Sequence, residues 1–456
     1  MRERIIHMPK YLYRTAAALC FGGLLAGCSN FLDSKGAKAD PNLPTGATTD
    51  QLFVGAQADI FAQQEGPLAM IACQWMQQCS GVNGRFVQQQ DSYSVDAGTF
   101  DLPFQEVYSA GGLVSLRTVE ANTAAAGDKV YQGIAQVLEA LLIGTTASIW
   151  GDIPYSEAVG GNPTPAFDGQ LAVYAALQTL LDAAITNLNG AGQGPGAVDL
   201  FYAGNKAQWV QAANTLKARF YLHTAEVAGA PAYTAARTAA LLGISSPAND
   251  LRTAHATATS ERNMWPQFQG TSFGPDLVAG KRLVDLMKAQ SDPRLPEYFG
   301  LAINGQYGGF DVTTGATPGD QISPLDGSRN GDTFRQPVAT WEENQLILAE
   351  TNFRLSGVVA AQPYLNAVRT ARGKGIVVAS LQTIMEEKYI ALFQNIEVWN
   401  DWKRTCFPVL TPAAGKTIIP GRLYYGQTEE QTNPNTPPSS AQNLSTVRNP
   451  NDPNGC

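Results

Sequence analysis

The pentapeptide Gly270–Gly274, "GTSFG", matches the G-x-S-x-G pattern in which serine hydrolases carry their nucleophile, here Ser272. The pattern needs a strand before the serine, and the preceding "RNMWPQFQ" is a poor candidate for a buried strand. A base is also needed, and beyond residue 27 the only histidines are His223 and His255. We therefore predict no catalytic residue and no enzyme. A surface hydrolase is the alternative, since two well-placed carboxylates suffice for a glycosidase.

Metal binding is not predicted either. The two histidines and the scattered cysteines lack the short ligand spacings of a zinc site. Asp326, Asn330 and Asp332 in "PLDGSRNGD" could offer oxygens to calcium. Their spacing differs from that of an EF-hand loop, and polar turns of this kind are common. We expect no metal ion and no cofactor.

Four cysteines beyond residue 28 could form disulfides. A bond between Cys406 and Cys456 would close a loop of about 50 residues and constrain the unfolded chain by about 4 kcal/mol. Cys73 and Cys79 would lie on different sides of one helix, so a bond between them requires the chain to turn there. We therefore take Cys406 and Cys456 as the disulfide candidates.

The N-terminus reads as an export signal at residues 1–27 followed by a tether at 28–44. Basic residues precede an apolar run that ends in "LAGC". This ending resembles the lipobox at which bacterial lipoproteins are cleaved and acylated, so we predict that Cys28 is lipidated and anchors the chain to a membrane. The following residues are polar and contain two prolines, which suits a tether.

The composition argues against a nucleic-acid partner. The chain has 31 basic and 39 acidic residues, a net charge of −8, and the export signal removes more basic than acidic residues. Surfaces that bind nucleic acid are basic. With 44% hydrophobic residues the chain can bury a large core.

Apolar residues recur at helical spacing along most of the chain, so we predict an all-α-dominated fold. A single domain at 45–456 would have a helical scaffold at about 49–72, 105–244 and 337–410. The clearest expected helices are Lys129–Trp150, Leu171–Leu188, Asn205–Val227, Tyr233–Leu242, Val338–Leu355, Pro363–Arg372 and Leu381–Ile396.

Two ranges, 73–104 and 245–336, are rich in Gly, Asn, Pro and aromatic residues and hold no steady period, apart from a helix expected at Asp276–Ala289. Loops of this length inside a globular protein are usually functional, so we expect the ligand to bind there.

The stretch Trp150–Ala158, "WGDIPYSEA", interrupts the longest apolar run. It could carry a working aspartate, Asp152, or form only the corner between two helices. Gly151 and Pro154 suit the end of a helix, and Asp152 can accept hydrogen bonds from nearby amides. We interpret the stretch as a structural corner.

Five segments in this order resemble the SusD/RagB family of outer-membrane nutrient-binding lipoproteins. They are "DPNLPTGATTDQLFVGA" at 40–56, "WGDIPYSEA" at 150–158, "NTLKARFYLH" at 214–223, "SDPRLPEYF" at 291–299 and "EEKYIALFQNIEVWNDWKRTCFPVL" at 386–410. The resemblance covers nearly the whole chain beyond the export signal.

This resemblance implies tetratricopeptide-like stacked helix pairs that support a loop-rich ligand-binding region. It also implies a lipid-anchored outer-membrane protein that faces the cell exterior and delivers its ligand to a SusC-like TonB-dependent transporter. Family ligands are oligosaccharides in most members and peptides in some, and the family is not catalytic. The residues after Cys28, "SNFLD", lack the acidic run often linked to surface export in this group.

A glycan site needs flat aromatic rings for the apolar faces of sugars and polar side chains for their hydroxyls. The two irregular ranges supply both, and Trp75, Arg85 and Trp265 are the first choices. The full set of predicted ligand-binding residues is Trp75, Asn83, Arg85, Phe86, Tyr93, Trp265, Phe268, Tyr307 and Phe310. Phe273 is a further aromatic of the second range, whereas we expect Trp399 and Trp402 in the core.

Overall fold

The computed structural model describes residues 46–456. The expected export signal, Cys28 and the tether at 28–44 lie outside the described residues. From Thr49 onward the regular structure is almost entirely helical, with only short two-stranded pairings, so the predicted all-α-dominated class is confirmed.

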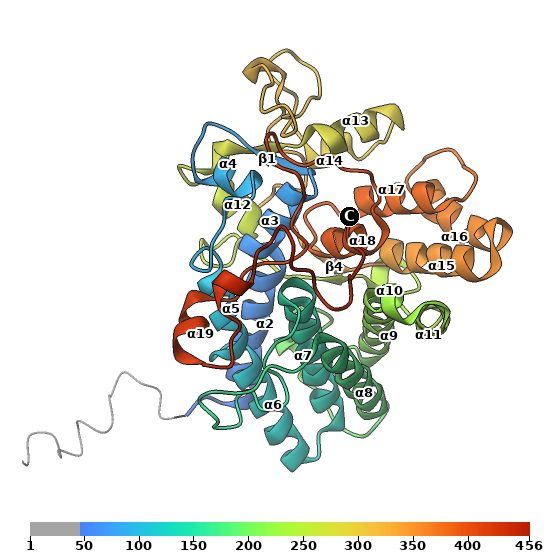
Figure 1. The fold of residues 1–456 in the computed structure, drawn as a ribbon. Helices are drawn as coiled ribbons and strands as arrows, with labels where there is room; N and C mark the ends of the chain where they lie inside the picture. The colour runs from blue at the N-terminus through green and yellow to red at the C-terminus, as the bar shows by residue number, and fades with distance from the viewer. Residues whose placement is uncertain (1–45) are drawn as a thin grey trace, which may run out of the picture. The chain divides into compact units, whose positions relative to one another are not determined.

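The scaffold consists of helices that pack on one another in chain order. Helix α7 contacts α6 and α8, α9 contacts α8 and α11, and α15 contacts α11, α16 and α17. Figure 1 shows them following one another along the lower and right side of the view. Their bounds are α6 (Leu113–Ala126), α7 (Lys129–Trp150), α8 (Gln170–Leu188), α9 (Lys206–His223), α11 (Ala230–Ala240), α15 (Trp341–Ser356), α16 (Val358–Ala371) and α17 (Leu381–Ala391).

The remaining elements are α2, which has 17 residues, and a set of shorter helices and strands. They are α2 (Thr49–Glu65), α3 (Pro67–Trp75), β1 (Cys79–Gly81), α4 (Phe86–Asp91), α5 (Asp101–Tyr108), α10 (Ala225–Ala228), β2 (Leu251–Arg252), α12 (Met264–Gln269), β3 (Leu277–Ala279), α13 (Lys281–Ala289), α14 (Leu295–Tyr298), β4 (Pro337–Ala339), α18 (Glu397–Thr405) and α19 (Gln427–Thr432).

Several helices begin where a side chain can cap them. Asp128 accepts the amide of Tyr131 at the start of α7, and Thr340 accepts that of Glu343 at the start of α15. Such caps satisfy amides that have no partner within the helix.

Several expected helix bounds are wrong. The helix expected to end at Ile396 ends at Ala391, the one expected to end at Val227 ends at His223, and the one expected from Tyr233 begins at Ala230. The helix expected at Asp276–Ala289 begins only at Lys281, because β3 pairs with β1. The helix expected from Val338 begins at Trp341, because Pro337–Ala339 pairs with β2. The helix expected from Pro363 already starts at Val358, so Pro363 lies inside the helix and has no amide to donate to the carbonyl oxygen of Val359.

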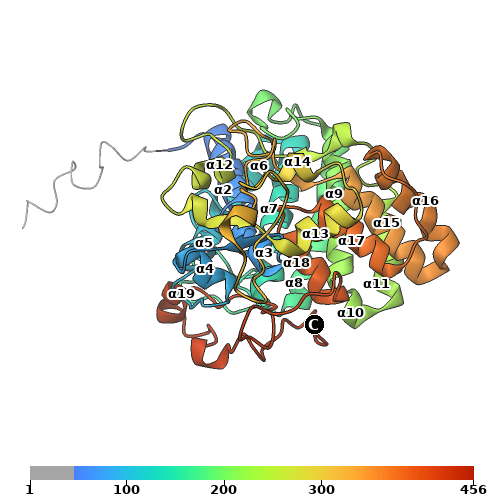
Figure 2. The same ribbon diagram turned by 90° about the horizontal axis from the view of Figure 1, so that it is seen from above.

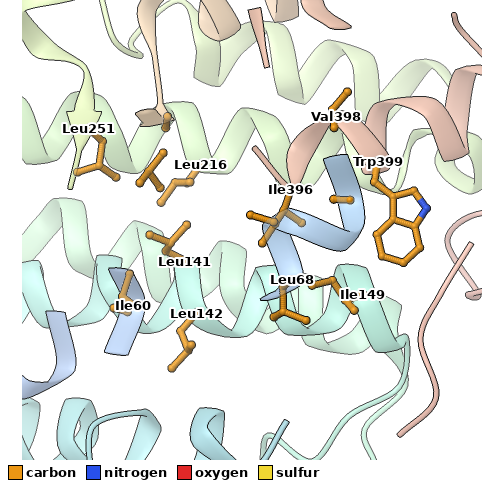
Figure 3. Packing of buried hydrophobic residues seen from close by; sticks show 14 of the residues in the cluster. Ile60, Leu68, Leu141, Leu142, Ile149, Leu216, Leu251, Ile396, Val398 and Trp399 are labelled. Atoms are coloured by element: carbon orange, nitrogen blue, oxygen red, sulfur yellow. The ribbon is translucent and has the colours of Figure 1, made fainter. Parts of the chain in front are cut away.

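Helix α7 is the central element of the hydrophobic core, as its all-round apolar sequence predicts. By length and composition α7 and α8 could each cross a membrane, but the apolar stretch of α7 is 94% buried within the protein. Figure 3 shows its side chains facing those of α2, α3, α9 and α18, with Ile60, Leu68, Leu141, Ile149, Leu216, Ile396 and Trp399 in view.

The corner after α7 is held by hydrogen bonds. Gly151 has φ of 87°, a conformation that favours glycine, and the side-chain oxygen of Asp152 accepts the amide of Gln170 at 2.8 Å. Ile153 and Asp168 exchange backbone hydrogen bonds across the turn. Asp152 thus connects the end of α7 to the start of α8.

The last 50 residues run along one face of the helices (Figures 1 and 2). Trp150 Nε1 donates to the carbonyl oxygen of Tyr424 at 2.8 Å, and Asn451 Nδ2 donates to that of His223 at 2.8 Å. A disulfide joins Cys406 to Cys456, with the two Cα atoms 5.3 Å apart. We call residues 411–456 the C-terminal strap.

A fully buried group of charges holds α17 to the segment before α14. Lys374 Nζ lies 2.6 Å from Asp292 Oδ2 and 2.8 Å from Glu387 Oε2, and Arg294 contacts the same two carboxylates. Burial alone would raise the pKa of the Asp292 carboxyl, but Arg294 and Lys374 lower it below its usual range. The same two cations lower the pKa of Glu387 against the effect of burial.

Candidate functional site

One antiparallel strand pair brings the two loop-rich ranges together. Gly81 at the end of β1 lies opposite Leu277 at the start of β3, and the amide of Val82 donates to the carbonyl oxygen of Asp276 at 2.9 Å. The residues that follow β1 therefore lie beside the residues that precede β3. A second disulfide, Cys73–Cys79, fixes the start of β1 to the end of α3.

Asp276 organises the polar part of this junction. It is 1% exposed, accepts a hydrogen bond from Asn83 at 2.8 Å and lies 2.5 Å from the guanidinium of Arg85. Arg85 also donates to the carbonyl oxygen of Ser272 at 3.0 Å. A buried carboxylate thus holds a half-exposed arginine in a defined position on the surface.

Two phenylalanine rings lie next to this arginine. Phe86 is 48% exposed and Phe273 is 40% exposed, and their centroids are 6.1 Å apart. The guanidinium of Arg85 stacks over the ring of Phe273 at 5.2 Å. Among residues 46–456 these are the only exposed aromatic rings. We call Arg85, Phe86 and Phe273 the ring platform.

A hollow of about 320 Å³ lies on another side of α4. Gly84 and the polar residues Gln88, Gln89 and Ser92 form one wall, and loops around Phe310 and Ala413 form the other. The ring platform and the hollow flank the first turn of α4. We call this second feature the α4 hollow.

Two further residues support the hollow: Asp91, which lines it, and the partly buried Tyr93. Asp91 is 1% exposed and accepts the amide of Gly81 at 3.0 Å. Burial raises the pKa of its carboxyl well above the usual range. The Tyr93 hydroxyl accepts the amide of Ala413 at 3.0 Å, and burial raises its pKa to about 12. These contacts join α4 to the C-terminal strap.

The comparisons with known proteins agree with this architecture. A family model described as "Starch-binding associating with outer membrane", the SusD-like family, matches residues 41–372. The chain belongs to the SusD-like family. The family description is that of a binding protein associated with the outer membrane and not of an enzyme. Among curated proteins, none matches the chain.

Solved structures share the fold of this SusD-like protein. A chitin-binding protein is 21% identical, with a TM-score of 0.72 over 88% of this chain and 98% of its own. A chitin-binding SusD homolog from Flavobacterium johnsoniae is 19% identical, with a TM-score of 0.72 over 88% and 97%. A SusD/RagB family protein from Bacteroides thetaiotaomicron is 18% identical, with a TM-score of 0.69 over 90% and 100%.

Within the SusD-like fold, the residues predicted to bind ligand lie in several different settings. Asn83, Arg85 and Phe86 lie together on the surface at the ring platform. Tyr307 and Phe268 are half-buried, and both pack against the hydrophobic core. Phe310 is 7% exposed but lines the α4 hollow, which Tyr93 supports from behind.

The two tryptophans chosen first are not on the surface. Trp75 is fully buried, with its ring 5.1 Å from Trp399 and 5.7 Å from Tyr93, and its Nε1 donates to the carbonyl oxygen of Gln90. Trp265 is 1% exposed. Both belong to the hydrophobic core because α3 and α12 are packed helices and not open loops. Trp399 and Trp402 are in the core, as predicted.

Sequence reasoning missed Asp276 and the residues of the C-terminal strap. Asp276 follows a proline in a turn, and only the β1–β3 register shows that it faces Arg85. Ala413 and Ala414 carry no chemical signal of their own, although they line the α4 hollow.

The residues with apparent catalytic or metal-binding chemistry lie in other settings. Ser272 is exposed between α12 and a short 3-10 turn, and the ring nitrogens of His223 and His255 contact Glu397 and Glu65. Asp332 pairs with Arg262. In the described part of the chain, no three His, Cys, Asp or Glu residues gather closely enough to hold a metal.

Proposed function

We propose that this SusD-like protein is a cell-surface glycan-binding lipoprotein that captures an oligosaccharide at the ring platform and delivers it to a SusC-like TonB-dependent transporter. The observation that carries the proposal is the pair of exposed rings, Phe86 and Phe273, beside an arginine held by a buried carboxylate. The proposed anchor is Cys28, in the outer membrane, with the domain facing the exterior.

The chemistry of the platform suits a sugar chain. The C–H face of a sugar ring packs against an aromatic face, and the surrounding hydroxyls need donors and acceptors. Arg85 supplies fixed donors beside the rings, and Asn83 and Asp276 keep it in place. A peptide-binding site would instead call for an exposed strand edge, whereas β1 is paired and buried.

Two of the structural relatives are named for chitin binding, which supports a glycan as the ligand class of this chain. The family description, with starch binding and outer-membrane association, supports both the ligand class and the compartment. Delivery to a transporter follows from the family resemblance, and the lipobox-like "LAGC" at residues 25–28 supports the anchor.

The test is binding by a soluble form of residues 28–456 with Cys28→Ser. Isothermal titration against a panel of oligosaccharides and peptides would identify the ligand, and mass spectrometry would show that it leaves intact. The double variant Phe86→Ala/Phe273→Ala should weaken glycan binding at least tenfold, about 1.4 kcal/mol. Circular dichroism should stay unchanged, because both rings are exposed.

A matched control is Leu241→Ala/Leu242→Ala, which removes two exposed apolar side chains, 61% and 63% exposed, at the end of α11. This variant should bind like the parent. Glycan binding that survives the loss of both phenylalanines would contradict the proposed site, and peptide binding or turnover of a bound glycan would contradict the proposed function.

A further inference from the structure

The α4 hollow differs from the ring platform in the chemistry of its walls. One wall is apolar and comes from loops that are distant in sequence: Phe310, Val312, Ala413 and Ala414. The other wall is polar and comes from α4 and the residue after it: Gln88, Gln89, the buried Asp91 and Ser92. The hollow therefore combines apolar and polar lining, whereas the ring platform offers two tilted aromatic rings and one guanidinium.

The polar wall presents amide groups that are free to bind. The side-chain oxygen of Gln88 accepts the amide of Gly84, which leaves the NH₂ group of Gln88 available as a donor. Gln89 is exposed, and its side-chain amide has no hydrogen-bond partner among the described residues. Ser92 uses its hydroxyl hydrogen on the carbonyl oxygen of Gln89, so its lone pairs can still accept.

These walls match the parts of an acetamido group. An acetamido substituent has a methyl group, a carbonyl oxygen that accepts and an N–H that donates. The apolar wall can cover the methyl group, a glutamine NH₂ can donate to the carbonyl oxygen, and a glutamine or serine oxygen can accept from the N–H. A plain sugar hydroxyl has no methyl group and would leave the apolar wall uncovered.

The size of the hollow agrees with one substituted sugar unit. At about 320 Å³ it is at the lower end of small-molecule sites, which run from about 300 to 1,000 Å³. Because the hollow and the ring platform flank the same turn of α4, one unit of a chain can rest on Phe86 and Phe273 while a neighbouring unit enters the hollow.

We propose that the α4 hollow is an acetamido subsite, so that the protein selects oligosaccharides of N-acetylated amino sugars over chains that carry hydroxyls at the same position. This inference rests on the proposed function, because it assigns a ligand class to the site next to the ring platform. The hollow supplies selectivity, and the ring platform supplies contact area that a glycan without an acetamido group can also use.

The test compares two β-1,4-linked hexamers that differ only in the substituent at C2, acetamido in hexa-N-acetylchitohexaose (below, chitohexaose) and hydroxyl in cellohexaose, by isothermal titration. The parent protein should bind chitohexaose at least tenfold more tightly. Ala414→Phe should fill the hollow and reduce this preference to less than threefold. Gln89→Ala should reduce it in the same direction without adding bulk, which keeps the test valid if Ala414→Phe perturbs folding.

A matched control is Ala183→Phe, which adds the same ring at an exposed position of α8 and should leave the preference unchanged. Equal binding of both probes by the parent, weakened by the loss of Phe86 and Phe273, would overturn the acetamido subsite and leave the proposed function intact. Binding of neither these nor any other glycan would overturn the proposed function itself. A preference that persists in both hollow variants would also overturn the subsite.

Discussion

The ring of Phe86 lies 6.1 Å from the ring of Phe273, although the two residues belong to different loop-rich ranges of the chain. The contact exists because β1 and β3 pair in a register that sets the residues after one strand beside those before the other. Arg85 then bridges the two sides, stacked on Phe273 and paired with Asp276. The platform therefore depends on a carboxylate beneath it that a ligand on the rings would not touch.

Replacing that carboxylate should weaken both the site and the fold. Asp276→Asn keeps the shape of the side chain but removes the charge that holds Arg85, so we expect a loss of about 1–2 kcal/mol of unfolding free energy. Glycan affinity should fall several-fold because Arg85 becomes mobile. Urea unfolding and titration calorimetry measure the two effects.

Asp285→Asn is the matched control, because Asp285 also pairs with a cation, Lys281, but both side chains are about half exposed. An exposed pair contributes little, so neither stability nor binding should change by more than about 0.5 kcal/mol. Equal effects of the two substitutions would show that the burial of Asp276 is not what positions Arg85.

Asp91→Asn should raise the unfolding free energy relative to that of the parent, by an amount that grows as the pH rises. Burial raises the pKa of Asp91 in the folded state, so on raising the pH above about 4 the unfolded chain releases its proton first. Stability then falls with pH by up to about 1.4 kcal/mol per unit, until the folded-state pKa is reached. Asparagine does not titrate, and its oxygen can still accept the amide of Gly81.

Urea unfolding at pH 4.5 and pH 7.5 checks this prediction. The stability of the variant relative to the parent should increase between the two pH values. A difference that stays constant with pH would mean that Asp91 keeps the same protonation state in the folded and unfolded chains.

The sequence predicted the long helices well and the surroundings of the candidate site residues only in part, for a common physical reason. Periodicity is local, so α7 could be read from residues 129–150 alone. Burial and strand pairing depend on distant partners. Trp75 is in the core because Trp399 packs on it, and Leu277–Ala279 is a strand because Cys79–Gly81 lies beside it. No spacing within either segment indicates these partners.

Lys374→Met should destabilise the protein strongly at neutral pH. The substitution removes a buried cation from Asp292 and Glu387, which would remain in the interior with fewer partners. Breaking such a group costs about 3–5 kcal/mol. Because the pKa values of both carboxyls are lowered in the folded state, their contribution is fully present above about pH 4 and is lost as the pH falls below it.

The difference in unfolding free energy between parent and variant should therefore be largest near pH 7 and shrink toward pH 3. Chemical unfolding across this range measures it, with Lys281→Met, whose partner Asp285 is half exposed, as the control. If the difference in unfolding free energy between parent and Lys374→Met grew as the pH fell, Asp292 and Glu387 would not both be ionised in the folded protein.

Removal of one disulfide should mainly lower stability, and removal of the other should mainly lower glycan affinity. In the chain-entropy description, removing the Cys406–Cys456 bond, with a sequence separation of 50, costs about 4 kcal/mol, and removing Cys73–Cys79, with a separation of 6, costs about 2 kcal/mol. The pairs Cys406→Ser/Cys456→Ser and Cys73→Ser/Cys79→Ser test this order by urea unfolding, with each pair replaced together so that no free thiol remains.

Glycan affinity should fall more in Cys73→Ser/Cys79→Ser than in Cys406→Ser/Cys456→Ser, the opposite of the order expected for stability. Cys79 begins β1, whose pairing with β3 places Arg85 beside Asp276, so loss of the short-range bond loosens the ring platform directly. Loss of the long-range bond frees the end of the C-terminal strap, but Tyr93 still binds Ala413, which lines the α4 hollow, and Trp150 still binds Tyr424. The contrary result is that Cys406→Ser/Cys456→Ser is the variant that binds glycan more weakly under native conditions. That result would show that the positioning of Arg85 by β1 does not determine affinity.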